Sequence, residues 1–129
     1  GTAFLVIAAP EEDALREAAY FVERLSEDDM PLAGLVVNRA TPETDHQISA
    51  DEAAAAAQRL DRAGPQAQRT AGLLRLYARR LRLIEREGRL RARFTAAHPT
   101  VPSTVVPALP TDVHDLNGLR QIGDLLAGN

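Results

Sequence analysis

An asparagine and a proline-bounded tetrapeptide are the parts of this chain whose residue types and positions most suggest ligand chemistry. Asn38 directly follows an apolar run, and its side-chain amide offers the donor and acceptor needed to recognise N6 and N1 of adenine. Asparagine is also a common turn residue, so the alternative is an ordinary strand end. Pro107, Ala108, Leu109 and Pro110 follow another apolar run, and they form either a stiff apolar wall beside a flat base or a strand stopped by prolines.

The chain lacks the groups that usually hold the phosphates of a nucleotide. It contains no lysine, so the residue with which a Walker A loop reaches the β- and γ-phosphates is absent. Its 8 glycines stand singly, so no glycine-rich loop of backbone N–H groups replaces that lysine. We therefore expect any phosphate chemistry to depend on groups outside this chain.

Metal and thiol chemistry are not indicated either. The chain has no cysteine, which excludes disulfides and thiolate metal sites and fits a cytoplasmic protein. His46, His98 and His114 lie in separate segments without a second ligand at a metal-site spacing. We interpret them as surface or capping histidines and predict no metal site.

Three short apolar runs indicate the fold class. They cover residues 4–9, 35–37 and 104–106 and end at Pro10, Asn38 and Pro107. Both faces of each run are apolar and the connections are long enough for crossover helices, so we predict three parallel strands in one α/β domain over residues 1–129. The carboxyl ends of parallel strands form the edge at which open α/β sheets bind ligands, so Asn38 and Pro107 would lie on that edge.

Helical signals fill the connections between these strands. We predict a crossover helix from the acidic run 11–13 to Met30, an alanine-rich helix from the Ser49/Glu52 capping box to Gly64, a long helix from about Gln68 to Ala96, and a final helix carrying Leu116, Leu119, Ile122 and Leu126. Residues 47–97 would be a helical insertion between the second and third strands. If the strands follow chain order, both connections lie on one face, and Val6, Ala8, Leu35 and Val37 or their alternates form an apolar patch on the other.

Charge is unevenly distributed along the chain. Residues 59–93 hold eleven arginines and three acids, a net charge of +8, so the rest of the chain carries −11 of the overall −3. A basic helix can attract nucleic acid, an anionic membrane or an acidic partner, and it can also be a solvated face. A content of only 4% aromatic residues disfavours a base-stacking platform, and we expect no nucleic-acid partner.

Two segments of the sequence resemble a known family. FLVIAAPEEDALREAAYFVERLSEDDMPLAGLVVNRA and VPALPTDVHDLNGLRQIGDLL are similar to the C-terminal part of anion-transporting (ArsA-like) ATPases, a deviant-Walker P-loop family, and most similar to the paired ATPases of high-GC actinobacteria. The resemblance covers almost the whole chain and is weakest over residues 41–97. It implies part of a three-layer P-loop NTPase fold, with three parallel strands, crossover helices and a helical insertion.

The same resemblance implies roles for the candidate site. In the family the asparagine that closes the VVN strand contacts the adenine of ATP, and this position is Asn38. The loop after the last strand wraps the base, and it corresponds to Pro107, Ala108, Leu109 and Pro110. The Walker A lysines, the switch aspartates and the magnesium ligand of the family lie in its N-terminal part and have no counterpart here. The isolated chain is therefore expected to be inactive.

The resemblance also implies partners. It implies the N-terminal half of a parent ATPase, a homodimer or a heterodimer with a paralogous ATPase, and a membrane-protein partner. Because the chain begins at Gly1, just before a strand, we expect it to be cut from a longer chain. The arsenite-binding cysteines and the zinc-binding CxxC of relatives are absent, which leaves the cargo open. The alternative is a non-enzymatic interaction module that uses the arginine-rich helical segment 50–97.

Overall fold

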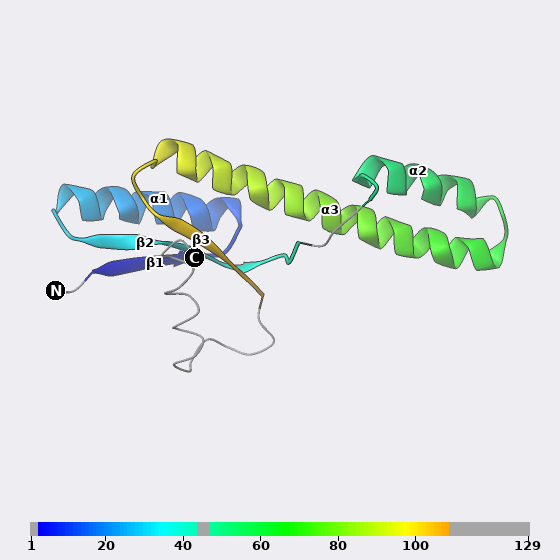
Figure 1. Ribbon diagram of the computed structural model, residues 1–129, viewed down its shortest axis with the longest axis horizontal. Coiled ribbons are helices and arrows are strands. Elements are labelled where there is room, and N and C mark those ends of the chain that lie inside the picture. Colours follow the sequence, from blue (N-terminus) through cyan, green and yellow to red (C-terminus); the bar gives the residue numbers. More distant parts are fainter. Residues whose placement is uncertain (1–2, 44–46, 109–129) are drawn as a thin grey trace. The chain divides into compact units, whose positions relative to one another are not determined.

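The computed structural model describes residues 3–43 and 47–108, which form three strands and three helices (Figure 1). In chain order these are β1 (Phe4–Ala8), α1 (Glu12–Glu27), β2 (Leu32–Ala40), α2 (Ala50–Asp61), α3 (Pro65–Ala97) and β3 (Ser103–Pro107). The chain divides into two compact units, one of residues Gly1–Ala40 with Glu87–Asn129 and one of residues Thr41–Arg86. The predicted final helix, around Leu116, lies outside the described residues.

The first unit contains a parallel sheet with the strand order β1-β2-β3, which confirms the prediction of an α/β arrangement. In the register, Ala8 of β1 lies opposite Val37 of β2, and Val37 lies opposite Val105 of β3. The strand β2 is longer than the apolar run 35–37 from which it was predicted. It begins at Leu32, which pairs with β1, and it continues beyond an irregularity to Ala40.

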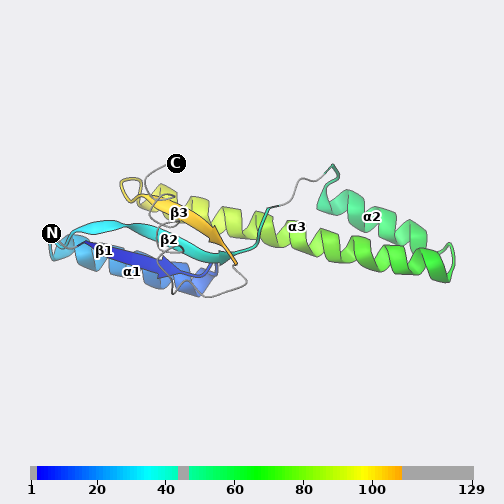
Figure 2. The same ribbon diagram turned by 60° about the horizontal axis from the view of Figure 1, so that its bottom comes forward.

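Helix α1 and the C-terminal end of α3 cover one face of this sheet, as sequential strand order predicts (Figures 1 and 2). The core on this face is formed by buried side chains of α1, of α3 and of the strands, namely Leu15, Ala18 and Val22, Phe94, and Ala8, Leu35 and Val37. The periodic apolar side of α1 and the alternate positions of β1 and β2 thus meet in one layer.

Leu5 and Ile7 of β1 alternate with the core residues of this strand and face away from α1 and α3. Val6 packs against the core, whereas Leu5 and Ile7 are 41% and 59% exposed. On β2 the corresponding alternate, Val36, is 1% exposed. The apolar patch expected on the uncovered face is therefore limited, among the described residues, to the outer strand β1.

The second unit is a helical hairpin of α2 and the N-terminal part of α3. Its buried positions are mostly alanines, and they are Ala50, Ala53, Ala57, Ala71, Ala78 and Leu81. The Oγ of Ser49 accepts a hydrogen bond of 3.1 Å from the N–H of Glu52, so the predicted cap at the start of α2 is confirmed. The small side chains of the buried alanines allow α2 and α3 to approach each other closely.

The loop between α2 and α3 covers residues 62–64 and lies about three residues earlier in the chain than predicted. Helix α2 ends at Asp61, and Gly64 has a φ of 106°, a left-handed conformation that glycine adopts without strain. Helix α3 starts at Pro65 rather than near Gln68, because proline suits the first helical position, where no intrahelical N–H bond is required. None of the helices in the described residues combines the length and the apolar character needed to cross a membrane.

Candidate functional site

A bulge at the carboxyl end of β2 positions Asn38. The register of β2 against β3 shifts between Val37 and Ala40, so Asn38 and Arg39 lie in the irregular stretch. Arg39 has a φ of 60°, in the left-handed region that non-glycine residues seldom adopt. Bulges and such strained residues occur preferentially beside binding sites, because they re-aim a side chain at the edge of a sheet.

A local hydrogen bond fixes the side chain of Asn38. Its Oδ1 accepts a hydrogen bond of 2.9 Å from the backbone N–H of Arg39. A backbone N–H can only donate, so the amide cannot reverse its oxygen and nitrogen without losing this bond. The side chain of Asn38 is half-buried, and its Nδ2 donors make no hydrogen bond with the described residues. These donors and one lone pair on Oδ1 are therefore available to a ligand.

The end of β3 lies next to this bulge. Pro107 is opposite Ala40 in the register, and the N–H of Ala108 donates a hydrogen bond of 3.0 Å to the carbonyl oxygen of Ala40. Pro107 and Ala108 are both exposed. The structure therefore brings three of the predicted site residues, Asn38, Pro107 and Ala108, to neighbouring strand ends, whereas Leu109 and Pro110 lie outside the described residues.

Acidic residues follow the carboxyl end of β1, which is the remaining strand end on this edge. The loop after β1 leads at once into α1, whose N-cap is Glu11 and whose first turn contains Glu12 and Asp13. These carboxylates favour the helix through its dipole, but they oppose the approach of phosphate to the same backbone N–H groups. The edge thus offers polar and apolar groups for a flat ring, and its helix start does not offer an anion site.

Arg39 is a residue of this edge that the sequence analysis passed over. Its side chain is exposed, and it is adjacent in sequence to the Asn38 amide. The available signal is the pattern Val-Val-Asn-Arg-Ala, in which two polar residues separate an apolar run from a further buried residue, Ala40. Such an insertion is typical of a bulge within a longer strand.

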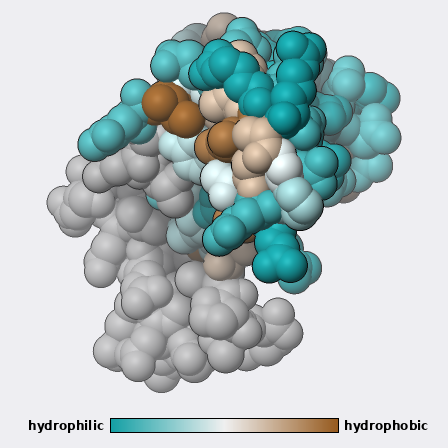
Figure 3. Space-filling view, turned by 90° about the vertical axis from the view of Figure 1, so that its right-hand side faces the viewer, coloured by the Kyte–Doolittle hydropathy of each residue, from teal (hydrophilic) through white to brown (hydrophobic). Residues whose placement is uncertain are grey.

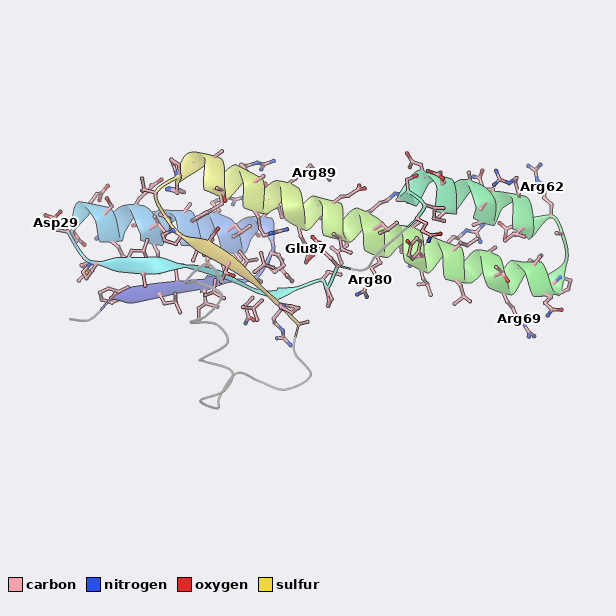
Figure 4. All side chains as sticks on the ribbon, viewed as in Figure 1. Asp29, Arg62, Arg69, Arg80, Glu87 and Arg89 are labelled. Carbon is pink, nitrogen blue, oxygen red and sulfur yellow. The ribbon has the colours of Figure 1, made fainter. Side chains whose placement is uncertain are left out.

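The arginine-rich segment does not form a single basic face in the second unit. Arg75 forms a bidentate ion pair with Asp61, and this hydrogen bond lowers the pKa of the Asp61 carboxyl below its ordinary value. Arg80 donates to the carbonyl oxygen of Pro42 at 3.0 Å. In Figure 4 Arg62 and Arg69 project from opposite sides of the hairpin. In Figure 3, viewed from the side of the α2–α3 loop, most of the coloured surface is hydrophilic.

Two cavities lie away from the Asn38 edge. One of about 550 Å³ is lined by Met30, Leu32 and Pro102, at the amino ends of β2 and β3. Another of about 230 Å³ lies between α1 and α3, with Leu15 and Phe94 among its lining residues. Neither is lined by the residues that the sequence analysis selected.

The described histidine has a packing role. The ring of His98 lies 4.8 Å from the ring of Phe94, directly after the end of α3. His46 and His114 lie outside the described residues. Over residues 3–43 and 47–108, no three histidine, aspartate or glutamate side chains gather in an arrangement that could hold a metal ion.

In comparisons with known proteins, no family model and no curated protein matches this chain.

Proposed function

We propose that this chain is the adenine-binding C-terminal portion of an ArsA-like ATPase, a P-loop NTPase-like fold of three layers of which it forms part. In the complete protein, ATP binding and hydrolysis would drive anion transport or membrane-protein targeting. The observation that carries the proposal is the meeting of Asn38 with Pro107 and Ala108 at neighbouring carboxyl ends of parallel strands.

The geometry at Asn38 suits an adenine ring. An Nδ2 donor of Asn38 matches the ring acceptor N1, and the free lone pair on Oδ1 matches the N6 amino group. Because the Arg39 N–H holds Oδ1, the amide presents this pattern in one orientation, which disfavours the inverted pattern of guanine. Pro107 and Ala108 supply apolar contact for the ring, with Leu109 and Pro110 as the continuation of that wall.

The phosphates require a different part of the protein. The chain has no lysine for a Walker A loop, and the acidic start of α1 opposes anions at the edge of the sheet. We therefore assign the triphosphate and Mg²⁺ to the N-terminal half of the parent ATPase, which is the expected partner. A homodimer or heterodimer with a paralogous ATPase, a membrane-protein partner and a cytoplasmic location belong to the same proposal.

A second candidate is a non-enzymatic interaction module formed by the helical segment 50–97. The observation that favours it is the exposure of large apolar side chains on α3, with Leu73 at 68% and Leu76 at 59%. Exposed apolar surface of this kind marks interaction sites.

A ligand panel separates the two candidates. Titration of the ¹⁵N-labelled chain with AMP should shift the NMR signals of Asn38, its side-chain amide, Arg39 and Ala108, with weak affinity. GMP should bind less well, and ribose 5-phosphate should shift only arginine-rich positions. Asn38→Ala should weaken AMP binding about tenfold, the effect of losing roughly 1.4 kcal/mol of hydrogen bonding.

The matched control is Gln58→Ala, which removes an exposed side-chain amide from α2. It should leave AMP binding unchanged. If AMP and ribose 5-phosphate shift the same arginine signals and Asn38→Ala has no effect, the adenine proposal is wrong and the interaction module is favoured.

A further inference from the structure

One side of α3 carries an apolar stripe that the hairpin leaves exposed. Leu73, Leu76, Arg80 and Leu83 follow one another at intervals of three, four and three residues, so they lie on the same side of the helix. Leu73 is 68%, Leu76 59% and Leu83 46% exposed. We call Leu73, Leu76 and Leu83 the leucine stripe, and Arg80 lies between its last two members.

The opposite side of α3 already has a partner. Ala71, Ala78 and Leu81 are buried, and Ala78 and Leu81 belong to the core that the hairpin forms with Ala50 and Ala53 of α2. Within the second unit, α3 is therefore apolar on two sides, and α2 covers one of them. An amphipathic helix needs a single apolar side, so the second indicates another contact.

The leucine stripe has basic flanks. Arg69 and Arg80 project from the side of α3 that faces away from α2 (Figure 4). Arg79 and Arg86 lie at the border of the stripe, each about one helical turn after a leucine of the stripe, Leu76 and Leu83 respectively. Arg69, Arg79 and Arg86 are exposed and make no ion pair with another residue of the described part of the chain. A partner for the stripe must therefore combine apolar side chains with negative charge.

Helix α1 has that chemistry. Tyr20 and Phe21 are each 57% exposed and lie edge to face, with ring centroids 6.2 Å apart. Residues 11–29 contain eight acids and two arginines. Glu17 and Glu27 are exposed on α1, one on each side of the aromatic pair in sequence. This acidic aromatic surface of α1 matches the leucine stripe in both polarity and charge.

We propose that α1 of one copy of this chain docks on the leucine stripe of a second copy. Tyr20 and Phe21 would contact Leu73, Leu76 and Leu83, while the flanking glutamates meet the flanking arginines. Every copy carries both surfaces, so a two-fold dimer makes the contact twice.

Exchanging the charges tests this pairing. One variant, Arg79→Glu with Arg86→Glu, makes the flank of the stripe acidic, and the other, Glu17→Arg with Glu27→Arg, makes α1 basic. Sedimentation velocity over a wide concentration range should show a dimer for the wild type and monomers for each variant alone. An equimolar mixture of the two variants should restore the dimer, because every α1–α3 contact then joins opposite charges.

All four substituted side chains are exposed, and circular dichroism checks that both variants fold. A monomeric wild type overturns the proposal, including the case in which it binds anionic vesicles or an acidic protein as a monomer. Dimers of both variants alone also overturn it, because association would then use another surface, such as the exposed side of β1. Failure of the mixture to dimerise has the same consequence.

Discussion

At the scale of single residues, the Asn38–Arg39 pair determines what the candidate site can bind. The left-handed Arg39 and the hydrogen bond from its N–H to Asn38 Oδ1 convert an ordinary amide into one with a fixed orientation. Orientation matters because a carboxamide that can rotate offers no preference between the donor and acceptor patterns of adenine and guanine.

The ion pair between Asp61 and Arg75 gives a pH-dependent contribution to stability. The hydrogen bond from Arg75 lowers the pKa of Asp61 in the folded chain, so the contribution is present above the unfolded pKa of about 3.9 and is lost as the pH falls through the lower folded value. Asp61→Asn should therefore lower the melting temperature slightly near pH 7, and this difference should disappear in strong acid. Glu85→Gln, which replaces an exposed acid of α3, is the control variant in the same melting experiment.

Two glycines of the hairpin should respond to substitution in opposite directions. A Cβ at Gly72 would meet no atom within 4 Å, and the residue lies inside α3, so Gly72→Ala should stabilise the chain by about 0.5–1 kcal/mol. Gly64 is equally uncrowded but has a φ of 106°, so Gly64→Ala should destabilise. Urea unfolding followed by circular dichroism measures both. Equal effects at the two sites would contradict this assignment of backbone conformation.

At the scale of elements, the α2–α3 contact depends on small side chains. Ala57 is 0% exposed in α2, so Ala57→Leu should destabilise the chain by about 1–3 kcal/mol through overpacking. Ala55 lies on the exposed side of the same helix, and Ala55→Leu should have little effect, since alanine and leucine have similar helix propensities. Urea unfolding of the two variants provides the comparison. A tolerated leucine at position 57 would mean that the helices are further apart.

The sequence predicted the elements better than their details. Apolar runs at residues 4–9, 35–37 and 104–106 predicted three parallel strands, and the Ser49 cap was found because both signals are local. The bulge at Asn38 involves pairing with β3, more than 60 residues later in the chain, so the local pattern Val-Val-Asn-Arg-Ala indicates it but does not determine its register. In the same way, the residues of the long helix do not reveal by themselves that Phe94 is buried and Leu73 exposed.

At the scale of the whole molecule, the central claim is a division of labour, in which this chain holds the base and other groups hold the phosphates. The chain alone should therefore show no ATP hydrolysis with Mg²⁺, because phosphoryl transfer needs positioned cations around the γ-phosphate. A phosphate-release assay on repurified protein measures this. Turnover above the buffer background that persists through repurification would contradict the division of labour.

Intermolecular NOE spectroscopy with AMP tests the central claim most directly, because it locates the adenine ring rather than any phosphate. We predict contacts from adenine H2, which adjoins N1, to the side-chain amide protons of Asn38, contacts from the ring protons H2 or H8 to the methyl group of Ala108, and the loss of these contacts in Asn38→Ala. Contacts restricted to arginine-rich positions of α3, or contacts unchanged in Asn38→Ala, would contradict it.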